Sequence, residues 1–226
     1  MKSLRKNTDR RRNRTSGFSL LEVMTVLMIS IVVSVVSVTS MIPVMAQFRL
    51  TNGYNTTLAA IRQARDNAVS QRTSYSVTFS NAVTPNTITV APTVASGGST
   101  FQGDQNSVTY QLPTGVTFYA YSTLASTPPP DGYGTGANAI DFGYTSNGVG
   151  TGGQTTFYFC PDGSAQDAEG GSGNCAGSWD GGVVYIAQQG NLLSSRAVDL
   201  WGATGRIHGW RLYPVTGGGN YQWIRQ

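Results

Sequence analysis

Residues 14 to 38 of the chain read RTSGFSLLEVMTVLMISIVVSVVSV. After Glu22 there is no charged residue until Arg49, and Val, Ile, Leu and Met make up most of the run. As a helix, residues 18 to 41 would extend about 36 Å, enough to cross the ~30 Å hydrocarbon core of a bilayer. The stretch therefore predicts a membrane-crossing helix near the start of the chain, with one acid, Glu22, five residues into the part that would lie in lipid.

The charges ahead of the apolar run indicate its orientation. Seven of the fifteen basic residues precede Gly17, and only Asp9 opposes them. From Phe18 onward eight basic residues face ten acidic ones, so this part has a net charge of −2. A basic segment ahead of an apolar run stays on the cytoplasmic side of the membrane. The slight acidity of the remainder gives no general basis for binding nucleic acid.

Two interpretations of this segment follow from the residues alone. A secretory signal peptide would be cleaved after Ala46, at Val44-Met45-Ala46, and would release a soluble β-rich binding domain. The apolar run is longer than such peptides usually have, and Glu22 is badly placed inside one. A plain single-pass anchor fits the length and the charges, but it leaves Glu22 in lipid at a cost of about 3 kcal/mol.

A third interpretation explains the acid. The segment GFSLLEVMTVLMISIVVSVVSV resembles the class III signal of type IV prepilins and type II secretion pseudopilins. Their pattern is a basic leader ending in Gly, an aromatic residue, Glu at the fifth mature position, and about twenty apolar residues. Gly17, Phe18, Glu22 and the run from Val23 match it. The resemblance implies that a prepilin peptidase cleaves between Gly17 and Phe18 and methylates the new amino group of Phe18.

The same resemblance implies a role for Glu22 in assembly. Cleavage would leave a cationic amine at the edge of an apolar helix, and Glu22 of one subunit would pair with the amine of a neighbour. An ion pair shielded from water is favourable only when both partners are present. Such a pair would set the register between subunits in a filament.

Beyond the apolar run, residues 49 to 72 keep a helical pattern that is broken near its middle. Asn52-Gly53 and residues 55 to 57 predict an interruption and a new helix start. Apolar residues then recur at helical spacing. Arg62, Arg65 and Arg72 are predicted to be solvated basic residues on this helix.

From Ser74 the pattern changes to alternation, with Tyr75, Val77 and Phe79 on one face of a strand. Further strands are predicted at 86–91, 107–112, 116–121, 139–143, 155–160, 183–188, 196–200 and 206–213, with a turn-rich stretch at 147–153. The predicted fold is α+β and pilin-like, a long N-terminal helix whose C-terminal half packs on an antiparallel β-sheet domain. The predicted domains are a cleaved leader (1–17), a transmembrane assembly helix (18–46) and a periplasmic domain (47–226).

A second resemblance narrows the family. LAAIRQARDNAVSQRTSYSVTF (58–79) is similar to the helix-to-strand segment of GspH/FimT-type minor pilins and pseudopilins. IDFGYTSNGVG, TFYFCPDGS and ATGRIHGWRL resemble later elements of that group. The resemblance implies a subunit of a type IV pilus or type II secretion pseudopilus, located in the bacterial inner membrane and then in the filament. It implies as partners the prepilin peptidase, other pilins, the inner-membrane assembly platform and membrane lipid, and it implies no cofactor.

Two cysteines, Cys160 and Cys175, enclose fourteen residues rich in Gly, Asp and Ser. Their even number and their position beyond a membrane segment predict a disulfide bond. Asp162, Asp167 and Glu169 in this loop offer oxygen ligands of the kind that calcium prefers. Their spacing matches no EF-hand, and we predict solvated acids and no metal.

Few residues suggest catalysis. His208 is the only histidine, and GTGANA (134–139) follows no predicted strand, so we predict neither an enzyme nor a nucleotide site. In FimT-like pilins that take up DNA, a terminal Gly-Arg-x-Arg element contributes to DNA binding. Gly205-Arg206-Ile207 match it, but His208 replaces the second arginine. DNA binding is therefore an alternative function, with Arg206, Arg211 and Arg196 as candidate contacts among aromatic residues.

Overall fold

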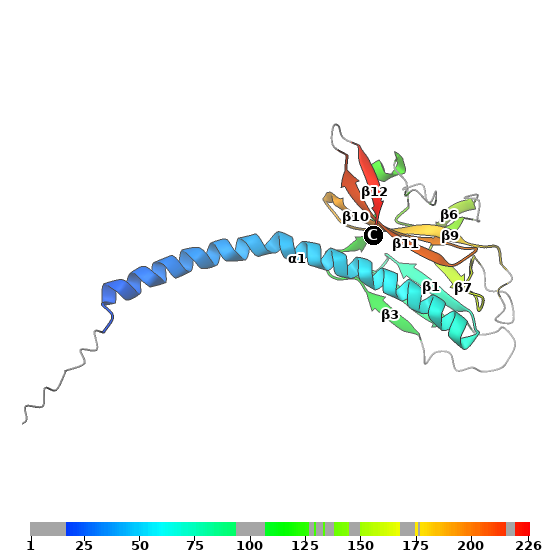
Figure 1. Ribbon diagram of the computed structural model, residues 1–226, viewed down its shortest axis with the longest axis horizontal. Coiled ribbons are helices and arrows are strands. Elements are labelled where there is room, and N and C mark those ends of the chain that lie inside the picture. The colour runs from blue at the N-terminus through cyan, green and yellow to red at the C-terminus, as the bar shows by residue number, and fades with distance from the viewer. Residues whose placement is uncertain are drawn as a thin grey trace, which may run out of the picture. The chain divides into compact units, whose positions relative to one another are not determined.

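The computed structural model describes residues 17–93, 107–126, 129, 133, 138–144, 150–167, 175, 177–215 and 220–226 (Figure 1). Residues 1–16 of the leader, Glu169 and most of the GTGANA stretch lie outside the described residues. The chain divides into two units, Met1–Val44 and Met45–Gln226. The division falls within one helix, α1 (Leu20–Gln71).

The start of α1 follows from local sequence. Ser19 precedes the first helical residue, and its carbonyl accepts hydrogen bonds from the backbone N–H of Glu22 (3.0 Å) and of Val23 (3.2 Å). Serine is among the residues preferred just before a helix. Glu22 lies in the first turn, where a negative charge interacts favourably with the helix dipole.

The predicted interruption of the helix at Asn52-Gly53 was wrong, since α1 continues through it. Gly53 is buried, and a Cβ added there would lie 3.0 Å from Cγ1 of Val116. Thr57, also buried, donates its hydroxyl to the Gly53 carbonyl at 2.9 Å. Glycine has a low propensity for helix interiors, which is why a helix end was predicted here. Gly53 is nevertheless accommodated inside α1, because its small size allows the helix to pack closely against Val116.

Five strands form one antiparallel sheet in the order β3-β2-β1-β7-β8. Their bounds are β1 (Tyr75–Ser80), β2 (Thr87–Pro92), β3 (Val108–Gln111), β7 (Thr156–Phe159) and β8 (Ala165–Gln166). Tyr75, Val77 and Phe79 share the buried face of β1, which confirms the predicted alternation.

Seven strands form a second sheet, in the order β12-β11-β10-β9-β5-β6 with β4 paired to β9. Their bounds are β4 (Thr117–Phe118), β5 (Ile140–Tyr144), β6 (Gly150–Gln154), β9 (Gly181–Gln188), β10 (Asn191–Trp201), β11 (Arg206–Pro214) and β12 (Tyr221–Arg225). A short 3-10 helix, η2 (Ser122–Ser126), follows β4. Every pairing in this sheet is antiparallel.

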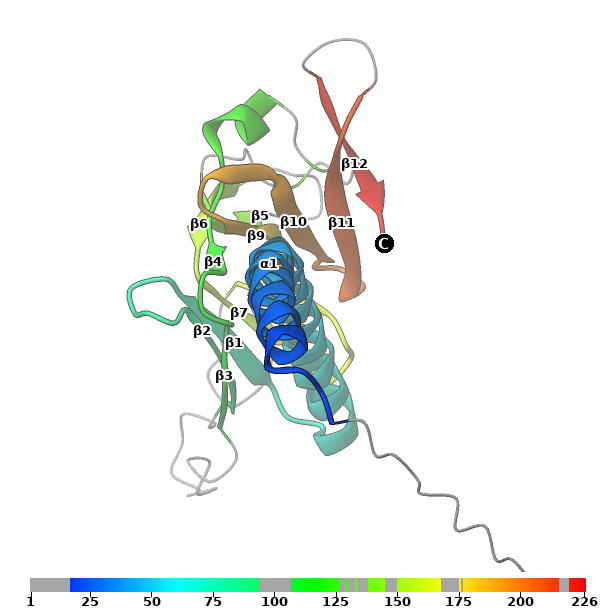
Figure 2. The same cartoon turned by 90° about the vertical axis from the view of Figure 1, so that its left-hand side faces the viewer.

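The second half of α1 packs against both sheets, and in Figure 2 the strands β1–β3 and β11–β12 lie to its two sides. Its buried residues recur at helical spacing and share one cluster with residues of both sheets. Phe79 lies at the centre of this core. Its ring centroid is 5.4 Å from that of Phe142, 5.5 Å from that of Phe118 and 6.2 Å from that of Phe157. Phe79 and Phe157 belong to the first sheet, Phe142 and Phe118 to the second.

The α+β class and the long N-terminal helix are confirmed, whereas the single predicted sheet is in fact two. The strands β6, β8 and β12 were not predicted. The sequence of β6 is GTGGQ, which has the composition of a turn, and the stretch 147–153 was predicted as one. The remaining predicted strands occur within a few residues of their expected bounds, and β10 is longer than expected.

Candidate functional site

The N-terminal half of α1 is an exposed apolar surface. All residues from 17 to 45 are exposed, and an 18-residue window of the helix has a mean hydropathy of 2.4. The described chain thus has one helix long and apolar enough to cross a membrane. Apolar surface of this extent is covered by lipid or by protein in its working environment.

Several hydroxyl side chains of this segment donate hydrogen bonds within the helix itself. Ser30, Ser34 and Ser37 donate their hydroxyls to carbonyls four residues earlier, at 2.7 to 2.8 Å. Thr25, Thr39 and Ser40 make the equivalent bonds to carbonyls three residues earlier. Hydroxyls bonded in this way are tolerated in lipid.

The three residues implied in processing and assembly lie at the start of the described chain. Gly17 and Phe18 precede the helix, and Phe18 is 81% exposed. Space around Gly17 is open, since a Cβ built there meets no atom within 4 Å. Glu22 is four residues after Phe18, on the first turn of α1. The Gly17–Phe18 bond is therefore in non-helical, accessible chain.

The predicted disulfide is present, between Cys160 and Cys175 with their Cα atoms 5.7 Å apart. It joins the end of β7 to the loop that leads to β9. The carboxylate of Asp162 accepts hydrogen bonds from the backbone N–H of Ser164 (2.8 Å) and from its hydroxyl (2.7 Å). Within the described residues no three His, Cys, Asp or Glu side chains come together as metal ligands. Asp162 thus supports a turn in this loop.

The three candidate arginines do not form one patch. Arg196 of β10 and Arg211 of β11 are direct cross-strand partners. On the same strands, Val198 pairs with Gly209, and a Cβ at Gly209 would collide with the hydroxyl of Tyr54 on α1. This face therefore points toward the helix. Because side chains alternate along a strand, Arg206 belongs to the opposite face from Arg211.

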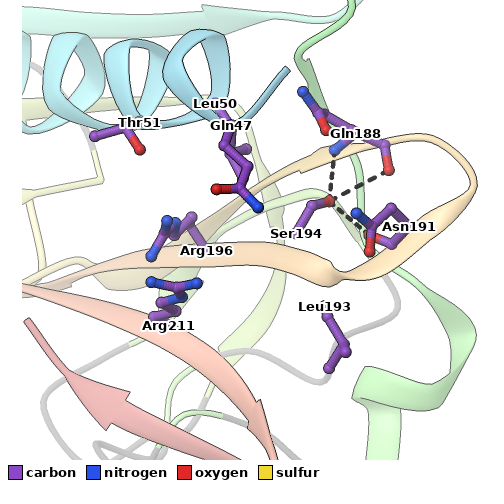
Figure 3. Close-up of a pocket in the computed structure, with 9 residues that line it drawn as sticks. All are labelled: Gln47, Leu50, Thr51, Gln188, Asn191, Leu193, Ser194, Arg196 and Arg211. Atoms are coloured by element: carbon purple, nitrogen blue, oxygen red, sulfur yellow. Dashed lines mark hydrogen bonds between the residues drawn. The ribbon is translucent and has the colours of Figure 1, made fainter. Parts of the chain in front are cut away.

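A pocket of about 400 Å³ lies where α1 passes the β9–β10 hairpin, and it contains Arg196 and Arg211 (Figure 3). Figure 3 shows the two guanidinium groups side by side, facing the turn of α1 that carries Gln47 and Thr51. The other lining residues are Leu50, Gln188, Asn191, Leu193 and Ser194. All nine belong to the unit Met45–Gln226.

The hairpin forms one wall of this pocket, and hydrogen bonds connect its two strands and join it to α1. The hydroxyl of Ser194 accepts a hydrogen bond from the Gln188 N–H at 2.9 Å and donates to the Asn191 carbonyl at 2.5 Å. The side-chain amide of Gln188 donates to the Ala46 carbonyl at 2.6 Å, which fastens the hairpin to α1. These groups shape the pocket, whereas the amide of Gln47 and the two guanidinium groups face into it.

The two arginines are unusual in their surroundings. Arg196 is only 8% exposed, and its Nε has no hydrogen-bond partner among the described residues. Burial and, next, the charge of Arg211 lower the pKa of the Arg196 guanidinium. The guanidinium of Arg196 lies 5.8 Å from the ring centre of Tyr54, and that of Arg211 lies 4.9 Å from the ring centre of Tyr213. Stacking on a ring holds a guanidinium in place and leaves its N–H edge available.

Arg206 takes part in a separate network on the other face of the sheet. Its Nε donates to Nε2 of His208 at 2.9 Å, and Nδ1 of His208 lies 3.6 Å from Oδ1 of Asp199. The indole N–H of Trp210 donates to Oδ2 of Asp199 at 2.5 Å. Asp199 and His208 are 2% and 5% exposed. Asp199, His208 and Trp210 thus join β10 to β11 inside the protein, whereas Arg206 at the first position of β11 is exposed.

The prediction that Arg65 is simply solvated was wrong. Its Nε donates to the Gly163 carbonyl and its Nη2 to the Thr204 carbonyl, both at 3.2 Å. Gly205, with a φ of +59°, approaches both Gly163 and Arg65 closely. Arg65 thus fastens α1 to two turns of the domain, and no feature of the local sequence indicates these distant carbonyls.

Asp180, directly before β9, is a buried acid whose burial was not predicted from the sequence. It is 1% exposed, and its Oδ1 accepts the N–H of Gly143 at 2.6 Å. Burial raises the pKa of Asp180 to about 7, with a smaller contribution from Asp167. Folded protein therefore keeps this side chain protonated at a pH where the unfolded chain has released the proton.

We expect this group to make stability depend on pH. The proton is bound in both states below about pH 4, and in the folded state it is lost as the pH rises through about 7. The free energy of unfolding should therefore fall over this interval, by at most about 1.4 kcal/mol per pH unit. Urea unfolding of wild type and of Asp180→Asn at a series of pH values isolates the effect. The contributions of the other titrating groups cancel when the free energy of unfolding of one protein is subtracted from that of the other. If the free energy of unfolding changed with pH in the same way for both proteins, the predicted contribution of Asp180 would be contradicted.

No family model, curated protein or solved structure matches this chain.

Proposed function

We propose that this protein is a minor pilin or pseudopilin, a structural subunit that assembles through its N-terminal helix into a type IV pilus or a type II secretion pseudopilus. The observation that carries the proposal is the exposed apolar half of α1, with a single acid in its first turn. A folded domain with its own core follows that helix. This combination suits a subunit whose helix lies in lipid before assembly and against other helices afterwards.

In this proposal the reactive groups are few and belong to processing and assembly. A prepilin peptidase cleaves between Gly17 and Phe18, and the amino group of Phe18 is methylated. Glu22 pairs with that amino group on a neighbouring subunit, where both charges are shielded from water. The accessible, non-helical chain at Gly17 and Phe18 supports cleavage at this bond.

The disulfide supports the periplasmic location of the domain that follows. Disulfides form and persist in oxidising compartments such as the bacterial periplasm. Cys160 and Cys175 are bonded, and the basic leader predicts that the chain beyond the helix is on the far side of the membrane. The prepilin peptidase, other pilins and the inner-membrane assembly platform are the expected partners.

The mature N-terminus gives the test of this proposal. We expect mass spectrometry of the protein purified from its native membrane to find N-methylated Phe18 as the first residue. An N-terminus at Gln47 would instead indicate release of a soluble domain by signal peptidase, and an intact leader would indicate a plain anchor. A Gly17→Val variant is the matched control, and it should accumulate with its leader attached.

A further inference from the structure

The pocket between α1 and the β9–β10 hairpin brings together two positive charges without a negative one. Arg196 and Arg211 are opposite each other on adjacent strands, an arrangement that is unfavourable for like charges. Within the described part of the chain, neither guanidinium has a carboxylate within salt-bridge distance. Buried charges in proteins are normally paired. An anion in the pocket would supply the missing partner.

The donors in the pocket suit a phosphate group. Arginine presents a planar fork of N–H groups that matches phosphate oxygens, and two such forks are held here by the rings of Tyr54 and Tyr213. The unpartnered Nε of Arg196 is buried and needs an acceptor. The amide of Gln47 adds a further donor at the same opening. A tetrahedral anion with several oxygens can accept from all of these groups at once.

The position of the pocket in the chain indicates where such a phosphate comes from. Gln47, Leu50 and Thr51 line it, and Gln47 is only three residues beyond Val44, the end of the exposed apolar unit. Three residues span at most about 11 Å even when extended, and the headgroup layer of a bilayer begins directly outside its hydrocarbon core. Leu50 and Leu193 give the pocket apolar walls beside its charged groups. The pocket thus combines charged and apolar surface close to the end of the membrane segment.

We propose that the Arg196–Arg211 pocket binds the phosphate of an anionic phospholipid headgroup in the outer leaflet of the membrane. The proposal requires that α1 lies in a membrane, but it does not require assembly into a filament. Bound lipid would hold the domain at the membrane surface.

The experiment titrates the full chain in nonionic micelles with three ligands, namely dihexanoyl phosphatidylglycerol, inorganic phosphate and a short DNA duplex. Each is measured by calorimetry and by the shift in melting temperature. Arg211→Gln removes one guanidinium from the pocket, and Arg225→Gln removes the same charge from an exposed position at the end of β12. The basic leader is common to all variants, so any contribution from it cancels in the comparison.

We expect phosphatidylglycerol to bind at least tenfold more tightly than inorganic phosphate. Arg211→Gln should weaken phosphatidylglycerol binding at least tenfold, whereas Arg225→Gln should change it less than twofold.

Without ligand, Arg211→Gln should melt at the same temperature as wild type or higher, because it removes a like-charge contact. If Arg211 had a purely structural role, Arg211→Gln would instead melt at a lower temperature than wild type. Arg211→Lys, which keeps the charge but lacks the fork, should also bind weakly. Glu22→Val should bind normally, which separates this proposal from the filament role.

Three results would overturn the proposal. Equal affinity for inorganic phosphate and phosphatidylglycerol would mean a site for free phosphate. Tighter binding of the DNA duplex, lost in Arg211→Gln, would assign the pocket to nucleic acid. An equal loss of phosphatidylglycerol affinity in Arg211→Gln and Arg225→Gln would mean that binding depends only on the net charge of the protein.

Discussion

Replacing Glu22 with valine is expected to reduce filament assembly at least a hundredfold while leaving cleavage at Gly17 and membrane insertion intact. Removing one partner of an ion pair shielded from water costs about 3–5 kcal/mol, because the other charge is left unpaired. Each 1.4 kcal/mol corresponds to about a tenfold change in an equilibrium constant. In the proposed filament, this loss would apply at each contact that Glu22 of this subunit makes with a neighbouring amino group.

A second account of Glu22 is local, and the size of the effect separates the two. Ser19 precedes the helix and Glu22 is three residues later, the spacing of a capping box. A cap or a favourable contact with the helix dipole contributes only about 1 kcal/mol. Glutamine satisfies a capping box as well as glutamate does, but it carries no charge.

The informative comparison is therefore between Glu22→Val and Glu22→Gln. The filament proposal expects both variants to be cleaved, inserted and defective in assembly. Sheared filaments quantified by immunoblot measure assembly, and mass spectrometry of the membrane fraction measures cleavage. Normal assembly of Glu22→Gln would leave the capping account as the better explanation of the acid.

The Phe79→Ala variant is expected to lose about 3–5 kcal/mol of folding free energy. The ring of Phe79 is 2% exposed and contacts aromatic rings from both sheets. Its removal would open a cavity at the point where the two sheets meet. Because whole domains are stable by only about 5–15 kcal/mol, much of this domain's stability should disappear.

Phe48→Ala is the matched control for this prediction. Phe48 is 68% exposed on α1, so the same change of side chain should alter the free energy of unfolding by less than about 0.5 kcal/mol. Urea unfolding in nonionic micelles, followed by near-ultraviolet circular dichroism, measures both variants. Similar midpoints for the two would show that Phe79 does not join the sheets as described.

Those parts of the fold that depend on local periodicity could be predicted from the sequence. The apolar run of α1 and the alternation in β1 were both found, because each is a repeated pattern within one segment. The disulfide followed from the number and setting of Cys160 and Cys175. The residues of the processing signal were recognised by resemblance, and their roles remain predictions.

The features that were missed depend on contacts between distant segments. The glycine-rich β6 is a strand because it pairs with β5, and Gly53 stays helical because it packs on Val116. Arg196 and Arg211 were suggested as contacts for DNA, but the sequence could not show that they share a face while Arg206 does not. That separation depends on the register between β10 and β11, which is a tertiary property.

The hydroxyl groups along the first half of α1 affect how the helix would pass from lipid to a protein environment. Every one described above donates to a carbonyl of the same helix, so none requires a partner from outside. Moving this surface from acyl chains to neighbouring protein therefore neither breaks nor forms a side-chain hydrogen bond at these positions. The free-energy difference between the two surroundings then rests on packing and on the single acid at the start of the helix. In the proposed filament role, the helix would pass from lipid to protein without rearranging these hydroxyls, and Glu22 would be the group that distinguishes the two surroundings.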